Sequence, residues 1–137
     1  AGQRGVDVLA FESFSGEWAR DLREILRIDD LHVLEAPYGA LPDLDAVDWS
    51  RDVVLTWNGT TSGVRMPGPD VVPVEHDGLV ICDATSAAFA MDLPWDRLDI
   101  VTWSWQKVLG GEAAHGMVAI SPRAAARLAA PSIRPLP

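Results

Sequence analysis

The sequence predicts an α/β fold with a mostly parallel sheet and flanking helices. A chain of 137 residues, 48% of them apolar, is long enough for one domain with its own core. Six short apolar runs rich in β-branched residues recur along it, and several lack any alternation of apolar and polar residues. Strands that are buried on both faces show this pattern, which is typical of parallel sheets covered by helices.

The apolar runs are predicted to be the strands of this sheet, and turn residues separate them. In chain order they cover residues 7–11, 31–36, 52–57, 79–83, 99–105 and 117–121. Short helical turns are expected after the fourth run and around residues 44–47. Residues 1–130 are therefore expected to form a single domain, and residues 131–137 an extended tail.

Two segments between or after these runs have the pattern of helices. The first is predicted to begin at Ser15, whose hydroxyl would cap it. Its apolar face is Trp18, Leu22, Ile25 and Leu26. The second is predicted to begin at residue 121 and to end before residue 131, because a proline occupies its first turn and another follows it.

Charge and composition exclude several classes of function. Twenty acidic residues against eleven basic ones give a net charge of −9, which disfavours binding to nucleic acid. No apolar run is long enough to span a membrane, and the first residues lack the pattern of a signal peptide, so a cytoplasmic protein is expected. His32, His76 and His115 show no metal-ligand spacing, and no metal is expected. The single cysteine, Cys82, is interpreted as a small buried apolar residue, the alternative being a reactive thiol.

Polar side chains follow three of the predicted strands, at the point where each strand ends. Because the carboxyl ends of parallel strands meet at one edge of a sheet, these side chains are expected to surround one crevice. They are Asn58, Thr60 and Thr61 after the third strand, Asp83, Thr85 and Ser86 after the fourth, and Gln106 and Lys107 after the fifth. The set combines one amine, one carboxylate and several neutral hydrogen-bonding groups.

Lys107 is the only lysine of the chain and lies in an apolar, aromatic stretch. A lysine amine can form a Schiff base with an aldehyde when its neighbours desolvate it, and Trp103, Trp105, Val108 and Leu109 are expected to do so. Pyridoxal phosphate is the natural aldehyde. Its ring nitrogen stays protonated only beside a carboxylate, which Asp83 would supply.

The remaining contacts of such a cofactor would come from neutral groups. Thr60, Thr85, Ser86 and Gln106 are candidates for hydrogen bonds to its ring oxygen or its phosphate, and Phe14 for stacking on its ring. Each residue has a structural alternative. Lys107 would be an ordinary surface cation, Asp83 a cap for the segment after it, and Phe14 a core residue.

Three blocks of the sequence are similar to a known family. The blocks ESFSGEWARDL, DVVLTWNGTTSGVRMP and GLVICDATSAAFAMDLPWDRLDIVTWSWQKVLGGEAAHGMVAISPRA resemble phosphoserine aminotransferases, a class V, fold type I family of pyridoxal-phosphate enzymes. The resemblance covers nearly the whole chain. It implies transfer of an amino group from glutamate to 3-phosphohydroxypyruvate, giving phosphoserine and 2-oxoglutarate in serine biosynthesis. Family members also act on a related acceptor in pyridoxine synthesis.

The resemblance also implies roles for individual residues. Lys107 would bind the cofactor aldehyde and move the substrate proton, and Asp83 would pair with the pyridine nitrogen. Thr60 would bond near the ring oxygen and Gln106 to the phosphate, while Ser86 and Thr85 would support Asp83. The family stacks a tryptophan on the cofactor ring; here Phe14 occupies that place, with Trp18 as the second choice.

Family members are more than twice as long as this chain, and their sites are completed across the interface of a homodimer. By resemblance, residues 1–130 would be the central part of the large domain, and 131–137 the start of a linker to a small domain. The 137 residues alone are then expected to bind cofactor weakly and to transaminate little. Two alternatives stay open: another class V aminotransferase with a different acceptor, and a non-catalytic α/β module.

Overall fold

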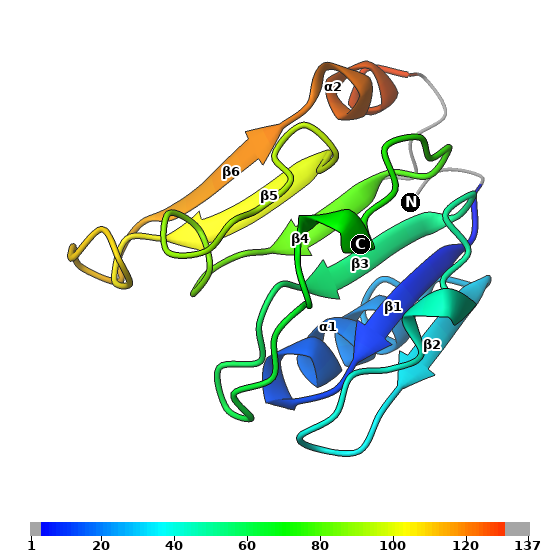
Figure 1. The fold of residues 1–137 in the computed structure, drawn as a ribbon. Helices are drawn as coiled ribbons and strands as arrows, with labels where there is room; N and C mark the ends of the chain where they lie inside the picture. Colours follow the sequence, from blue (N-terminus) through cyan, green and yellow to red (C-terminus); the bar gives the residue numbers. More distant parts are fainter. Residues whose placement is uncertain (1–3, 131–137) are drawn as a thin grey trace.

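The computed structural model describes residues 4–130, which form one six-stranded sheet with two α-helices (Figure 1). The strands run in the order β2-β1-β3-β4-β5-β6. Their bounds are Val6–Ala10 (β1), Leu31–Glu35 (β2), Asp52–Thr56 (β3), Val80–Asp83 (β4), Ile100–Ser104 (β5) and Gly116–Ile120 (β6). The first five are parallel, and only β6 pairs antiparallel, with β5. All six predicted strands and the mostly parallel α/β class are confirmed.

Helix α1, Ser13–Glu24, covers one face of the sheet. Its buried residues Ala19 and Leu22 pack with Val8 of β1 and Val54 of β3. The predicted apolar face is wrong at Ile25, which is the C-cap residue of the helix and is 57% exposed.

The start of α1 differs from the prediction, because Ser15 is not its cap. Glu12 caps the helix: its carboxylate accepts the Ser15 N–H at 2.7 Å. The Ser15 hydroxyl accepts in return from the backbone N–H groups of Phe11, at 2.9 Å, and Glu12, at 3.0 Å. The residue types of a capping box are exchanged here, with the acid at the cap and the hydroxyl three residues later. This box anchors the turn between β1 and α1.

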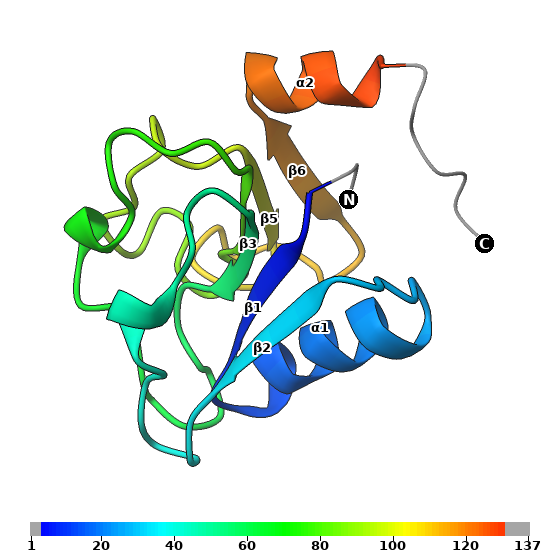
Figure 2. The ribbon, with the colours of Figure 1, turned by 90° about the vertical axis from the view of Figure 1, so that its right-hand side faces the viewer.

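The opposite face of the sheet is covered by the connections after β2, β3 and β4, as Figure 2 shows. These connections contain two short 3-10 helices, η1 (Leu44–Ala46) and η2 (Pro69–Val71), and a series of turns after Asp83. The turns after Asp83 and at residues 44–46 confirm the short helical segments expected there. Trp57, Met66 and Val72 are buried on this side and form one cluster with the strands.

Helix α2, Pro122–Leu128, follows β6 and lies within the predicted range; the Ser121 hydroxyl caps it. Two ion pairs hold it to the amino ends of strands: Arg123 pairs with Asp99 at 2.6 Å, and Arg127 pairs with Asp52. The tail predicted at 131–137 lies outside the described residues. Within residues 4–130, neither helix has the length and apolar character needed to cross a membrane.

Candidate active site

A cavity of about 190 Å3 lies where β3, β4 and β5 end. It brings together all seven site residues predicted from the sequence. The lining residues are Phe14, Thr56, Asn58, Thr60, Asp83, Thr85, Ser86, Gln106 and Lys107. Of the predicted strand-end groups only Thr61 is not among them. The amine of Lys107 and the carboxylate of Asp83 thus line the same cavity, as expected of two parallel strand ends that meet at one edge.

Strand register explains why the cavity lies on the side of the sheet that α1 covers. Val54 pairs with Ile81, and both pack in the cluster under α1. Two residues further along, Thr56 pairs with Asp83 and therefore lies on the same face. The first turn of α1 begins beside this edge and supplies Phe14.

The carboxylate of Asp83 is held by three hydrogen bonds. The backbone N–H and the hydroxyl of Thr85 donate to its Oδ1 at 2.9 and 2.6 Å. The indole N–H of Trp18 donates to Oδ2 at 3.0 Å. The bond from the Thr85 N–H also caps the turns that follow β4. Asp83 therefore has the capping role that was its structural alternative, and it lines the cavity as well.

Of the two residues expected to support Asp83, Thr85 contacts it, whereas Ser86 contacts a different residue. The Ser86 hydroxyl instead bonds to the Thr60 hydroxyl at 2.9 Å, because the turn after Asp83 directs it toward the loop that follows β3. This bond joins the ends of β3 and β4 across the cavity. Either hydroxyl can be the donor, so one hydrogen remains for a ligand.

The loop after β3 is a narrow hairpin held against the start of α1. Asn58 and Arg65 face each other across it. The Thr61 hydroxyl donates to the second carboxylate oxygen of Glu12 at 2.9 Å. Gly59 lies so close to Glu12 that an added Cβ would come within 2.4 Å of the Glu12 Cγ. Glu12, which sequence reasoning did not select, thus fixes both the helix cap and the loop that carries Thr60.

The predicted desolvation of Lys107 is not found, and the prediction is wrong for three of its four neighbours. Lys107 itself is exposed. Trp105 is 42% exposed, Val108 54% and Leu109 49%, because the turns between β5 and β6 cross the molecular surface. Trp103 alone of the four is half-buried, packing edge-on against Phe89 and Trp95.

Phe14 and Trp18 occupy different places on α1. Phe14 lines the cavity and is 47% exposed, which excludes its structural alternative as a core residue. Trp18, one turn later, is half-buried, contacts Asp83 and does not line the cavity. The geometry therefore favours Phe14 over Trp18 as the ring that faces a bound molecule.

Thr56 is the second residue that sequence reasoning missed. Its side chain is 97% buried, since only 3% is exposed, yet its hydroxyl has no hydrogen-bond partner among the described residues. It lines the cavity beside Asp83. A buried hydroxyl without a partner costs free energy, and a polar ligand in the cavity would remove that cost. The position at the end of β3 was the available signal.

Cys82, in β4, does not line the cavity. It is fully buried, and burial together with the charge of Asp83 raises the pKa of its thiol far above the ordinary value. A thiol with so high a pKa is not a nucleophile near neutral pH. The interpretation of Cys82 as a buried apolar residue is confirmed.

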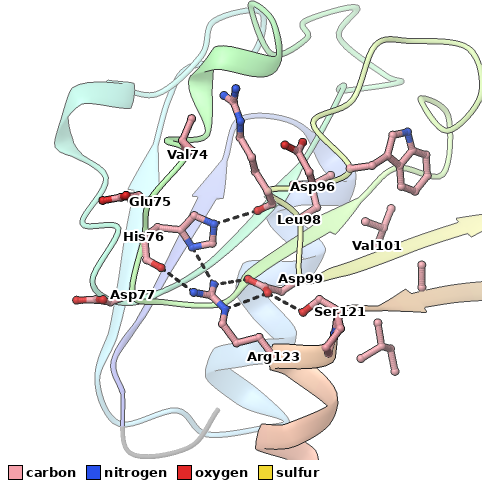
Figure 3. Close-up of a pocket in the computed structure, with 15 residues that line it drawn as sticks. Val74, Glu75, His76, Asp77, Asp96, Leu98, Asp99, Val101, Ser121 and Arg123 are labelled. Carbon is pink, nitrogen blue, oxygen red and sulfur yellow. Dashed lines mark hydrogen bonds and ion pairs between the residues drawn. The ribbon is translucent and has the colours of Figure 1, made fainter.

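A larger hollow of about 700 Å3 lies at the amino end of β5, away from the cavity (Figure 3). Its central polar groups bond to one another: Arg123 donates to Asp99 and to His76, and the Ser121 hydroxyl donates to Asp99. These groups hold α2 in place, so we assign the hollow no chemistry. Residues 4–130 contain no cluster of His, Cys, Asp and Glu suited to a metal ion.

Comparison with known proteins finds relatives that match most of this chain. No family model matches the sequence. The chain is 61% identical over 127 residues to the phosphoserine aminotransferase of Methanosarcina mazei. The alignment covers 93% of this chain and 34% of that protein.

Two solved structures share the fold. Pyridoxamine-pyruvate aminotransferase from Mesorhizobium loti aligns with a TM-score of 0.81 at 24% identity, covering 98% of this chain and 37% of that one. A phosphoserine aminotransferase from Cytophaga hutchinsonii aligns with a TM-score of 0.75 at 24% identity, covering 93% of this chain and 38% of that one. The chain spans about a third of the length of the curated relative that it matches.

Proposed function

We propose that the protein is a phosphoserine aminotransferase, which transfers an amino group from glutamate to 3-phosphohydroxypyruvate with pyridoxal phosphate as cofactor. The observation that carries the proposal is the shared cavity of Lys107 and Asp83. The high identity to a relative of that name supports the reaction and the substrates. A non-catalytic module would need no such pairing of one amine and one carboxylate.

The cavity residues fit the cofactor. Thr56 offers a buried hydroxyl without a partner, and the Thr60–Ser86 pair offers a spare hydrogen for an anionic oxygen. Gln106 adds an amide on the side of Lys107. Phe14 presents an aromatic ring at the edge of the cavity, where a flat ligand can stack on it.

The proposed roles follow from the chemistry of each side chain. When bound, pyridoxal phosphate supplies an aldehyde and a protonated ring that withdraws electrons from the substrate α-carbon. Asp83 would hold the proton on the ring nitrogen, and Lys107 Nζ would bind the aldehyde carbon. Once released by substrate, the same amine would carry the proton to and from the α-carbon.

Neutral groups would orient the ring and the phosphate. Thr60 would donate to the ring oxygen and Gln106 to the phosphate, while Thr85 and Ser86 would hold Asp83 and Thr60 in place. The Thr85 hydroxyl is hydrogen-bonded to Asp83 at 2.6 Å and the Ser86 hydroxyl to Thr60 at 2.9 Å. These bonds limit the rotation of the Asp83 and Thr60 side chains. Donors fixed before a ligand binds lose little entropy when it does.

The finer features are likewise proposals. Residues 1–130 would form the central part of the large domain, in a cytoplasmic homodimer whose subunits complete each other's sites. A related phosphorylated 2-oxo acid of pyridoxine synthesis would be a second acceptor. The cavity is formed by only three strand ends and α1, which agrees with a site that needs further donors.

Activity of the protein expressed from its natural gene tests the proposal. With phosphoserine, 2-oxoglutarate and pyridoxal phosphate we expect glutamate formation, and Lys107→Ala should abolish it. Arg65→Ala, at an exposed position that does not line the cavity, is the control for substitution of a cation. If unphosphorylated serine reacts as well as phosphoserine, the assignment of phosphoserine as the substrate is wrong. If neither amine donor is turned over, the proposed aminotransferase reaction is wrong.

A further inference from the structure

We infer that Trp18 is a positioning residue, whose indole N–H holds the Asp83 carboxylate in the orientation that receives the cofactor's ring nitrogen. The inference rests on the proposed function and extends it to a residue that does not line the cavity. It begins from the 3.0 Å hydrogen bond between Trp18 Nε1 and Asp83 Oδ2.

The two oxygens of Asp83 are held from two different elements. Thr85, in the turn after β4, occupies Oδ1 with two hydrogen bonds, and Trp18, on α1, occupies Oδ2 with one. Either contact alone would restrict rotation of the carboxylate about its Cβ–Cγ bond less than the two do together. Together they fix its plane relative to both the sheet and the helix.

Counting acceptor sites shows what remains for a ligand. An ionised carboxylate has about four lone-pair sites, and the three donors from Thr85 and Trp18 leave about one. The indole N–H is a donor only, so Trp18 cannot take a proton from the cofactor or from Asp83. The remaining site is on Oδ2, since Oδ1 already accepts two bonds.

The helix gives Trp18 a fixed position. Phe14 and Trp18 are four residues apart and so lie on the same side of α1, one turn from each other. The Glu12–Ser15 box fixes the start of the helix, and the packing of Ala19 and Leu22 fixes its rotation. Successive turns of α1 thus place Phe14 at the cavity and Trp18 in contact with Asp83.

A cofactor analogue separates this role from simple packing. We would measure the dissociation constants of pyridoxal phosphate and of its 1-deaza analogue, in which carbon replaces the ring nitrogen, on the natural full-length protein. The ratio of the two constants reports the contact between Asp83 and the ring nitrogen. Trp18→Phe keeps an aromatic ring and removes the N–H donor.

Trp18→Phe should reduce the preference for pyridoxal phosphate over the analogue about tenfold, the low end of the range for one hydrogen bond to a charged group, and change binding of the analogue less than about twofold. Trp49→Phe, whose indole N–H has no hydrogen bond within residues 4–130, should change neither. Benzothienylalanine at position 18, with sulfur in place of N–H, should reproduce the Trp18→Phe result even if that variant folds poorly.

Equal weakening of both ligands by the position-18 variants would overturn the inference, because it would show a packing role alone. An unchanged ratio would overturn it as well. Failure of the proposed function gives a different result: the unsubstituted protein, and Asp83→Asn, would then show no preference between the two ligands. That result would remove the role of Asp83 and, with it, the role of Trp18.

Discussion

The Thr56 hydroxyl is the sharpest single-residue feature of the cavity. It is buried at the end of β3, lines the cavity beside Asp83 and has no partner among the described residues. Such a group destabilises the protein unless a ligand bonds to it. The Thr56 hydroxyl should therefore lower the stability of the cofactor-free protein and raise its affinity for a polar ligand.

Thr56→Val replaces the hydroxyl by a methyl group of nearly the same shape. We expect the free energy of unfolding of the cofactor-free protein to rise by about 1 kcal/mol, and the dissociation constant of pyridoxal phosphate to rise about fivefold. Denaturant unfolding and titration of the cofactor measure the two changes. Thr102→Val is the matched control, because Thr102 also pairs with Asp83 but does not line the cavity. A loss of stability in Thr56→Val without a change in affinity would contradict this account.

The start of α1 is the element on which the site depends most. Ser15 is 1% exposed and accepts hydrogen bonds from two backbone N–H groups, and Glu12 joins the helix to the loop that carries Thr60. Ser15→Ala should lower the free energy of unfolding by roughly 1–3 kcal/mol, since both N–H groups lose their acceptor in a buried place. Urea unfolding tests this, with the exposed Ser13→Ala as control. Equal effects of the two substitutions would exclude the box as the anchor.

Helix α2 is held by a buried carboxylate, which makes its attachment sensitive to acid. Burial would raise the pKa of Asp99, but hydrogen bonds from Arg123, Val80 and Ser121 outweigh it and the pKa lies below its usual value. A carboxyl with a lowered pKa in the folded state stabilises the protein above the pKa of the unfolded chain, about 3.9, and this contribution is lost as the pH falls through the folded pKa.

Asp99→Asn mimics the protonated carboxyl at every pH. It should lower the free energy of unfolding at pH 7, and its difference from the unsubstituted protein should shrink below about pH 4. Stability curves at several pH values give this difference, with the exposed Asp96→Asn as control. A difference that stays constant down to pH 2 would show that the charge of Asp99 does not hold α2.

At the scale of the whole molecule, local patterns were enough to predict the strands and most of the cavity. Apolar runs indicate buried strands whichever strands they pair with. The carboxyl ends of parallel strands lie at one edge of the sheet, so the sequence could place Asp83 and Lys107 together. The antiparallel direction of β6 could not, because it depends on the path of the connection from β5.

Long-range packing explains what the sequence did not reveal. The contact of Trp18 with Asp83 depends on how α1 rotates over the sheet, and the place of Thr56 beside Asp83 depends on strand register. Spacing along the chain does not reveal the first contact, and for Thr56 it gives only the place at the end of a strand. The exposure of Lys107 was mispredicted for a similar reason, because apolar neighbours in sequence desolvate a side chain only where the fold packs them around it.

The Lys107 amine and the Asp83 carboxylate share one cavity, which we propose holds pyridoxal phosphate. The most direct measurement is borohydride reduction of the natural protein after incubation with the cofactor, followed by peptide mapping of the attached pyridoxyl group. We predict attachment at Lys107, in a yield that falls in Asp83→Asn. A label at other amines with none at Lys107, or a yield at Lys107 that is unaffected by Asp83→Asn, would contradict the claim.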